Sequence, residues 1–497
     1  MTHNPHNASP KGGLSSRDVL AASLLFAGLA TLFAFTRSHW LDDWDSVNFA
    51  LGLDDFDVLR HQPHPPGYPI YIAAGKLLYR VIADHAAALT LVSALAGAAI
   101  ASMFYLLDRR QNDWQMALCA TLIMALSPLY WLQSGLALTD MFGMVSVLAF
   151  LLVEGTTPAT PRGQFIRRIA CGLIAGLSLG ARPHLTLLIV LYWCLRAAPW
   201  SNPIKASHVL TAVFALAVGI AAWLVPASLA TGGPETYLTA TVGQFEWRLG
   251  RPGVSVLGTP ITFDYWLARG LNLIGSVGQA FAPMHLTADH IARRAAISLL
   301  IIAFYVFFAW RSPSKDVARP YIAACTIYLV MLFILLPVRH LRYFLPLSLI
   351  VGWAVSGYLA MFVKPVFRAA ALAALLAVTV LPSFFLVGQL SKTPPPVSTF
   401  DWVRSNHPAA ILYSDQLRRH ADFYWREGDA RAEPQDEKGC DNLRKALEAG
   451  RVVLSTKPEL CGVSGREVAS FKRDARVHDK HHRITVFELG KPPAGQG

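Results

Sequence analysis

The chain has 497 residues, of which 54% are hydrophobic and only 15% are charged, and its mean hydropathy is +0.39. Soluble globular proteins carry about 25% charged residues, so this composition excludes an ordinary soluble domain and indicates a protein that crosses a membrane several times. The formal net charge of +12 is better explained by basic loops beside membrane spans than by nucleic-acid binding.

Apolar stretches near the ~20 residues that a spanning helix needs recur along the chain. The N-terminal segment is too polar and too long for an ordinary cleaved signal peptide, so Val19 is predicted to open a retained span. The fifth and sixth stretches are short, and we expect a tilted or re-entrant pair around Arg182-Pro183. The predicted spans are 19–36, 86–107, 114–132, 135–153, 169–181, 184–196, 209–230, 295–310, 320–338, 343–363 and 369–390.

Basic residues gather before the first span and after the second, fourth, sixth, eighth and tenth. Because cytoplasmic loops carry an excess of Lys and Arg, this predicts a cytoplasmic N-terminal tail, residues 1–18. The loops 37–85 and 231–294 and the tail 391–497 then lie outside, and a bacterial inner membrane is the expected location. The clusters are Lys11 and Arg17; Arg109 and Arg110; Arg162, Arg167 and Arg168; Arg196 and Lys205; Arg311, Lys315 and Arg319; Lys364 and Arg368.

Residues 263–284 are largely apolar but contain Asp264 and Arg269, so we predict an interfacial helix there. If this segment crosses instead, the tail changes sides.

The chain turns polar after three consecutive prolines at 394–396, and strand-like and helix-like patterns then alternate. This is typical of a small α/β domain. The predicted fold is therefore mainly α: a polytopic helical bundle of about eleven spans, with a C-terminal extracytoplasmic α/β domain. Cys440 and Cys461 are the cysteines outside apolar spans, and an oxidising compartment would favour a disulfide between them. The expected tail elements are helices at 399–405 and 442–449 and strands at 409–413, 452–455 and 484–489.

The predicted topology brings ionisable residues to the outer face, where charges at membrane depth are functional hypotheses by default. Simpler interpretations stay open. Arginines at span ends can reach lipid headgroups, Asp140 can pair with an arginine, the acidic loop can be solvated surface, and the prolines after His64 can be only a stiff turn. The gathered residues are Asp42, Asp43, Asp45, His61, His64, Asp140, Arg182, His184, Arg339, His340, Arg342 and Tyr343.

Carboxylates and basic groups at one membrane boundary suit transfer of a sugar from a lipid phosphate. A carboxylate can take the proton of the attacking hydroxyl as general base, and arginines can stabilise the departing phosphate with forked hydrogen bonds. We expect Arg339 and Arg342, helped by Arg182 or His340, to hold that phosphate. Asp43 and Asp45 also have the D-x-D spacing that can hold a divalent cation, Mg²⁺ or Mn²⁺; no other cofactor is expected.

At these residues the sequence resembles the GT-C superfamily of integral-membrane glycosyltransferases, such as protein O-mannosyltransferases and aminoarabinose transferases. The resemblance implies a catalytic domain over 19–390, a polyprenyl-phosphate-linked sugar donor and a catalytic aspartate in the first outer loop. Ser46 stands where members often have glutamate, which leaves open the choice among Asp42, Asp43 and Asp45 and the use of metal. The motifs are the acidic stretch 42–53, HPPGYP at 64–69, ALTD at 137–140, GARP at 180–183 and RYFLP at 342–346.

We favour Asp45 as the base. On a helix that begins near Asp43, Asp45 and Phe49 share a face, and partial burial would raise the pKa of the carboxyl. His64 would then contact donor or acceptor. The expected partners are the lipid-linked donor, membrane lipid and an acceptor protein, lipid or glycan.

Two other functions compete with sugar transfer: a lipid-linked saccharide transporter or flippase, and a non-catalytic assembly factor. A transporter would need charged residues through the depth of the membrane, whereas here they gather at one face, which favours the transferase.

Overall fold

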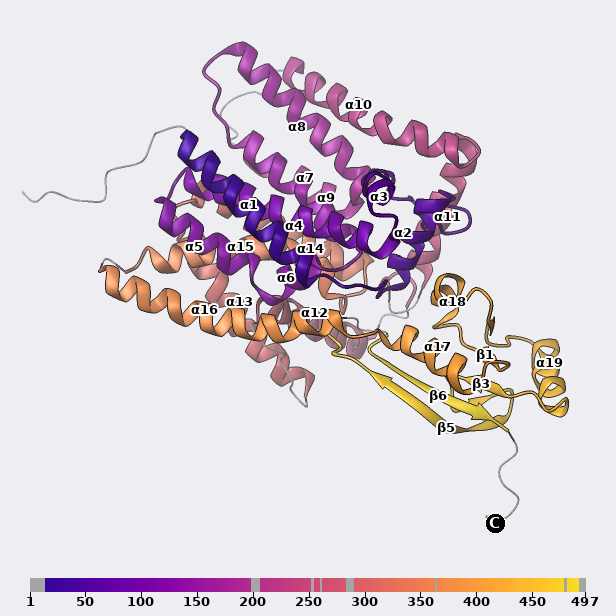
Figure 1. The fold of residues 1–497 in the computed structure, drawn as a ribbon. Helices are drawn as coiled ribbons and strands as arrows, with labels where there is room; N and C mark the ends of the chain where they lie inside the picture. The colour runs from indigo at the N-terminus through magenta and orange to yellow at the C-terminus, as the bar shows by residue number, and fades with distance from the viewer. Residues whose placement is uncertain are drawn as a thin grey trace, which may run out of the picture.

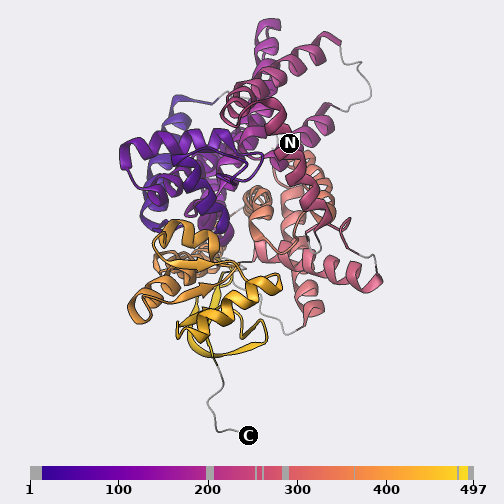
Figure 2. The ribbon, with the colours of Figure 1, turned by 90° about the vertical axis from the view of Figure 1, so that its right-hand side faces the viewer.

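The structure, a computed structural model, describes residues 14–197, 206–251, 254–259, 262–282, 290–362, 364–477 and 481–490. A bundle of helices makes up most of it, and a small sheet domain lies against one end (Figures 1 and 2). The predicted mainly α fold with a C-terminal α/β domain is confirmed. The bundle contains α1 (Ser16–Thr36), α2 (Trp44–Asp54), α3 (Pro69–Ile82), α4 (His85–Arg109), α5 (Trp114–Ala125), α6 (Pro128–Ser134), α7 (Thr139–Glu154), α8 (Pro161–Ala181), α9 (Pro183–Ala197), α10 (Ala206–Ala230), α11 (Pro234–Gly250), α12 (Phe263–Phe281), α13 (Ile291–Trp310), α14 (Lys315–Leu335), η2 (Leu341–Leu347), α15 (Ser348–Leu359), α16 (Pro365–Val387) and η3 (Gly388–Ser391).

Each predicted span coincides with a helix or with a pair of helices. In the described residues, six helices are long and apolar enough to cross a membrane, and α5 with α6, bent by 70° at their junction, makes a possible seventh. The remaining predicted spans correspond to α7, α8, α9 and α15 with η2, which are shorter or less apolar. Burial explains why these helices can be shorter or less apolar. A helix such as α15, which packs against protein on nearly every side, does not have to match the thickness of the lipid.

The fifth predicted span, 169–181, is shorter than the helix that contains it, α8. α8 has 21 residues and begins at Pro161, so the arginines that were expected in a loop lie in its first turns. Arg167 donates hydrogen bonds to the backbone oxygens of Glu154 and Thr156, at 2.9 and 3.1 Å. These contacts give the charged start of the helix polar partners, which a hydropathy pattern cannot show.

The predicted basic clusters meet at one end of the bundle, as their alternation along the chain requires. Arg109 at the end of α4 lies 2.7 Å from Asp18 at the start of α1. Arg196 at the end of α9 lies 3.5 Å from Glu154 at the end of α7. Lys11 and Lys205 lie outside the described residues. The structure therefore shows that these basic residues lie at the same end of the bundle. The side of the membrane on which this end lies stays a prediction.

The first outer loop forms α2 and α3, joined by the proline-rich turn. Asp43 caps α2 by accepting a hydrogen bond from the backbone N–H of Asp45 at 2.9 Å. Pro69 is the first residue of α3, where its fixed φ suits the helix. Gly67 has a φ of +87°, and a Cβ there would lie 2.8 Å from Phe56 and Val58, so this turn requires glycine.

In the second outer loop, 231–294, the sequence predicted only the helix that is now α12. It forms, and it is not among the candidate spans. The structure adds α11, which begins at Pro234 and was not predicted. The hydroxyl of Tyr237 on α11 donates to the backbone oxygen of Pro66 at 2.6 Å. This contact brings the second outer loop against the proline-rich turn of the first.

The C-terminal domain is a six-stranded sheet with strand order β2-β1-β3-β6-β5-β4. β1 pairs in parallel with β2 and β3, while β6 runs antiparallel to β3 and β5. The predicted helices and strands form. The sequence did not predict β2, β4, β5 and α18. Most residues of β5 are polar or exposed, so they give little strand signal. Its elements are α17 (Pro395–Asn406), β1 (Ile411–Tyr413), α18 (Arg418–Tyr424), β2 (Asp429–Arg431), α19 (Glu437–Glu448), β3 (Val453–Ser455), β4 (Glu459–Leu460), β5 (Val463–Lys472) and β6 (Arg483–Leu489).

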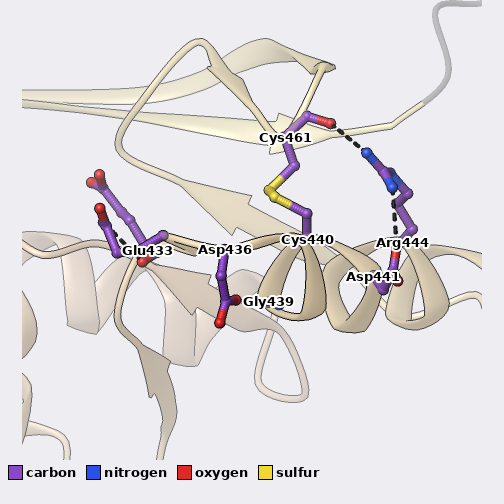
Figure 3. The surroundings of a disulfide bond; sticks show 8 residues. Glu433, Asp436, Gly439, Cys440, Asp441, Arg444 and Cys461 are labelled. Carbon is purple, nitrogen blue, oxygen red and sulfur yellow. Dashed lines mark hydrogen bonds and ion pairs between the residues drawn. A yellow bond between two sulfur atoms is a disulfide. The ribbon is translucent and has the colours of Figure 1, made fainter.

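The predicted disulfide between Cys440 and Cys461 is present (Figure 3). It joins α19 to the turn that follows β4. Arg444, one turn further along α19, donates to the backbone oxygen of Cys461 at 3.4 Å. The disulfide thus fastens the outer helix of the domain to its sheet.

Candidate active site

Arg342 joins two of the three predicted acidic residues. Its Nη1 lies 3.2 Å from Oδ2 of Asp43, and its Nη2 lies 2.8 Å from Oδ2 of Asp45. Asp43 and Asp45 stand at the start of α2, and Arg342 stands in η2, almost 300 positions away in the sequence. The fork of the guanidinium therefore spans both carboxylates, a geometry that lysine cannot reproduce.

His64 lies on the other side of Asp45. Its Nδ1 is 3.4 Å from Oδ1 of Asp45, and its Nε2 is 3.1 Å from the hydroxyl of Tyr68. Phe49 packs against His64 and Tyr68, with ring centroids 6.3 and 5.5 Å away. Burial lowers the pKa of His64 to about 4, so the imidazole is neutral near pH 7. His64 can therefore orient Asp45 by polar contact without bringing a positive charge.

The pKa of Asp45 is lowered, which contradicts the expectation that burial would raise it. Burial is the largest influence and does raise the pKa, as does Asp43, but His64, Arg342 and Arg248 together outweigh both. His64 is the largest of these three lowering influences, followed by Arg342 and then Arg248. The expectation failed because the sequence did not show that arginines from two distant helices approach this carboxyl.

A second buried ion pair lies beside the first. Arg182 Nη2 is 2.8 Å from Oδ1 of Asp140, and Arg182 Nη1 donates to Thr139 Oγ1 at 2.7 Å. Both charged side chains are at most 5% exposed. The guanidinium also lies 5.5 Å from the ring of Tyr68 and 5.9 Å from that of Tyr343. Asp140 is thus paired with an arginine, which was one of the interpretations left open.

Tyr343 connects Arg182 to the remaining predicted residues. His184 packs edge-on against its ring at 5.4 Å, His340 lies 5.8 Å from the same ring, and Arg342 lies 5.6 Å from it. These contacts bring most of the predicted residues into one continuous group.

Two cavities meet at this group. One, of about 570 Å³, has mainly apolar walls from α8, α9, α10, α11 and α14. The other, of about 760 Å³, is more polar and lies between the first outer loop, α11 and the C-terminal domain. The residues that line both cavities are Asp45, Gln244, Arg248, Arg342 and Tyr343. A lipid-like molecule and a polar molecule could therefore reach the same carboxylate from two directions.

Gln244 and Arg248 were missed by sequence reasoning. They lie on α11, and Arg248 forms no salt bridge with any residue that the structure describes. Nε of Arg182 and Nε of Arg342 are buried and find no hydrogen-bond acceptor within the described part of the chain. The charged segment around Arg248, EWR at 246–248, offered no signal that set it apart from other polar parts of that loop.

Asp42 and Arg339 lie apart from this meeting point, since neither lines the apolar or the polar cavity. Asp42 is buried in an ion pair with Arg473 of the C-terminal domain. Arg339 is exposed and lines a third cavity of about 420 Å³, between α12, α13 and the segment after β5. His340 lines the third cavity and the polar cavity. Arg339 and Arg342 therefore share the third cavity but not the apolar one.

The donor set does not suit a divalent cation. Across the described ranges, no cluster of three or more His, Cys, Asp or Glu side chains is arranged to hold a metal. Asp43 and Asp45, the D-x-D pair, both face the guanidinium of Arg342, which occupies the position between them. Because this positive charge contacts both carboxylates of the D-x-D pair, we derive no step through a metal.

No protein-family model matches the sequence, and no curated protein matches it. Among solved structures, the chain is similar to the Archaeoglobus fulgidus oligosaccharyltransferase tethered with an acceptor peptide. The TM-score is 0.52 and the identity 13%, over 88% of this chain and 69% of that one.

ArnT from Cupriavidus metallidurans bound to undecaprenyl phosphate aligns at a TM-score of 0.48 and 15% identity, over 97% of this chain and 100% of that one. The arabinofuranosyltransferase AftD from Mycobacteria aligns at 0.34 and 15%, over 97% and 40%. At such identities, similarity speaks to the fold alone. The oligosaccharyltransferase match shows that this chain shares the fold of that protein, in agreement with the predicted resemblance to the GT-C superfamily of integral-membrane glycosyltransferases.

Proposed function

We propose that this protein transfers a sugar from a polyprenyl-phosphate-linked donor to an acceptor hydroxyl at the outer face of the membrane, with Asp45 as general base. The observation that carries the proposal is the meeting of an apolar and a polar cavity at Asp45 and Arg342. A ligand with a long apolar tail and a charged head fits the first cavity, and a polar acceptor fits the second.

The apolar cavity suits the lipid part of the donor. Its walls include Leu187 on α9, Ile220 and Trp223 on α10, and Met331 on α14. Its polar end holds the guanidinium groups of Arg182, Arg248 and Arg342. We assign the donor phosphate to this end, in place of the expected assignment to Arg339, because Arg339 lines a different cavity.

The reaction balances within this geometry. The acceptor hydroxyl enters from the polar cavity, its oxygen attacks the anomeric carbon, and its proton passes to Asp45. The bond between the anomeric carbon and the phosphate oxygen breaks, and its electron pair leaves with the lipid phosphate. Asp45 is ionised near neutral pH because its pKa is lowered, so it can receive the proton without prior deprotonation.

Arginines stabilise the charge that the leaving phosphate gains. The free Nε–H groups of Arg182 and Arg342 and the side chain of Arg248 are the available donors. Arginine suits this task because its fork binds two phosphate oxygens together. Arg342 also contacts Asp45, so one guanidinium connects the base to the leaving group.

The test is single-turnover sugar transfer by the Asp45→Asn variant, with a panel of undecaprenyl-phosphate-linked sugars as donors. Losing a general base typically lowers the rate by ~10²- to 10⁴-fold. Binding of undecaprenyl phosphate should persist, because the arginines remain. Asp54→Asn is the matched control: Asp54 ends the same helix, pairs with His85 at 2.8 Å and lines neither cavity.

Near-normal transfer by Asp45→Asn would remove this residue from the chemistry. Wild-type protein that binds undecaprenyl phosphate but transfers no sugar would instead favour the transporter or the assembly factor.

A further inference from the structure

The C-terminal domain contacts the first outer loop immediately before α2, the helix that carries Asp45. The hydroxyl of Tyr424, at the end of α18, accepts a hydrogen bond from the backbone N–H of Leu41 at 2.7 Å. The next residue, Asp42, forms an ion pair with Arg473, which follows β5. Asp43, the cap of α2, comes directly after these two anchored residues.

The ion pair between Asp42 and Arg473 is fully enclosed. Each side chain is only 3% exposed. The guanidinium of Arg473 also donates two hydrogen bonds to the backbone oxygen of Gln389, at 2.9 and 2.6 Å, where α16 gives way to η3. Its backbone N–H donates to the backbone oxygen of His482 at 2.7 Å, directly before β6. One side chain thus ties together the first outer loop, the last span and the sheet.

A second arginine holds the other side of the loop. Arg419 on α18 donates from Nη2 to the backbone oxygens of Arg60 and His61, each at 2.8 Å. Its Nε contacts Oδ1 of Asn48, one turn along α2. His61 opens the turn that carries His64. The domain therefore forms hydrogen bonds both to α2 and to the turn that carries His64.

We propose that the C-terminal domain is a clamp on the catalytic loop and that Arg473 is its principal positioning residue. This inference rests on the proposed function for its catalytic consequence. α2 has 11 residues, and isolated helices of this length are marginal in water, so its order depends on tertiary contacts. A catalytic group must be held within about 0.5 Å of its productive position, and the clamp supplies that restraint for Asp43 and Asp45.

Removing Arg473 alone would leave the carboxylate of Asp42 buried without its cation, which is strongly unfavourable. One of its oxygens, Oδ2, already lacks a hydrogen-bond partner in the described structure. The loop is then expected to move so that Asp42 reaches water. Asp45 would move with it, because only two residues separate them.

The test compares the full-length variants Arg473→Met, Arg473→Met with Asp42→Asn, and Arg466→Met. Arg466 is the matched control, since it is an exposed arginine on β5 that pairs with Glu488 on β6. In Arg473→Met, kcat should fall about 10- to 100-fold, as misplaced catalytic groups do, with unchanged binding of undecaprenyl phosphate. Backbone hydrogen exchange over residues 41–54 should rise, and Arg466→Met should change neither quantity.

The double variant separates positioning from folding. Without a buried carboxylate, its thermal stability should recover toward the wild type, while kcat stays low because the link to the domain is missing. Unchanged exchange over residues 41–54 in Arg473→Met, unchanged kcat, or full recovery of kcat in the double variant would overturn the proposal. A wild type that transfers no sugar would refute the proposed function, and the exchange measurement would still decide whether the clamp exists.

Discussion

Arg342 is the residue whose partners define the site. Its guanidinium contacts both Asp43 and Asp45, lies 5.6 Å from the ring of Tyr343 and lines all three cavities. An arginine in this position opposes the effect of Asp43, which by itself raises the pKa of Asp45. The same charge faces the end of the apolar cavity where a phosphate would lie.

This arrangement predicts how activity responds to pH. The pKa of Asp45 is lowered in the folded protein, so the base is lost only as pH falls below the ordinary aspartate value, about 3.9. The acid limb of kcat/KM should therefore lie below that pH. In Arg342→Met, burial and Asp43 should dominate, the pKa of Asp45 should rise, and the acid limb should move upward.

The measurement is the pH profile of the residual kcat/KM of Arg342→Met. Arg339→Met serves as the control, because Arg339 lines neither cavity that contains Asp45, and its acid limb should stay in place. An acid limb at the same pH in Arg342→Met and wild type would show that Arg342 does not set the pKa of the base.

At the scale of elements, the proline-rich turn sets the position of His64 relative to α2. A Cβ at Gly52 on α2 would lie 2.9 Å from Cδ of Pro63, so helix and turn are in direct contact. The backbone N–H of Gly67 donates to the oxygen of His64 at 3.0 Å. The stiff-turn interpretation and the functional one are thus compatible, since the turn presents His64 to Asp45.

Gly67→Ala should therefore reduce both stability and transfer. A side chain at a φ of +87° that also meets Phe56 and Val58 at 2.8 Å should lower the free energy of unfolding by about 1–3 kcal/mol. Thermal unfolding in detergent and single-turnover transfer would measure the two effects. Gly243→Ala on the exposed face of α11, where a Cβ meets nothing within 4 Å, should be neutral or slightly stabilising. Equal behaviour of the two variants would contradict the role of the turn.

The disulfide is the second feature at this scale. Cys440 and Cys461 are 21 positions apart, and closing a loop of this size stabilises a domain by about 3 kcal/mol. Replacing both cysteines by serine should lower the unfolding temperature of the C-terminal domain. The control is Cys194→Ser, which removes an exposed free thiol of the bundle. An unchanged unfolding temperature of the domain would show that α19 is held by packing alone.

At the scale of the whole molecule, the two ends of the bundle differ in chemistry. Basic clusters meet acidic partners at one end, as in the pair of Arg109 with Asp18. The acidic loop, η2 and the C-terminal domain share the other end, where Arg473 contacts Asp42. The positive-inside rule then predicts that the first end is cytoplasmic and that the domain and the site face outward.

Reporter fusions test this orientation. A fusion after residue 395 should behave as extracytoplasmic, and one in the short turn after Arg110, between α4 and α5, should behave as cytoplasmic. The second fusion is the internal control for the first. Cytoplasmic behaviour after residue 395 would contradict this orientation. Because Arg473 contacts Asp42, the site lies on the same side as the domain and would then face the cytoplasm.

The sequence by itself determined the class of fold, the positions of the predicted spans, the alternation of basic ends and the C-terminal domain, and it favoured a disulfide between Cys440 and Cys461. Each of these depends on local properties: the length of an apolar stretch, the charge of a short loop, or the number of cysteines outside spans. HPPGYP and the acidic stretch before it also pointed to the GT-C fold. Such features can be predicted without knowing which helices contact one another.

Only the tertiary structure decided which charges become partners. Arg342 pairs with Asp43 and Asp45, Arg182 pairs with Asp140, and Arg473 pairs with Asp42. The members of each pair are at least 42 positions apart in the sequence. The sign of the pKa shift of Asp45 follows from these approaches, since burial alone would have raised it. Electrostatic interaction depends on distance in space, and helix packing sets that distance between residues whose separation along the chain carries no information about it.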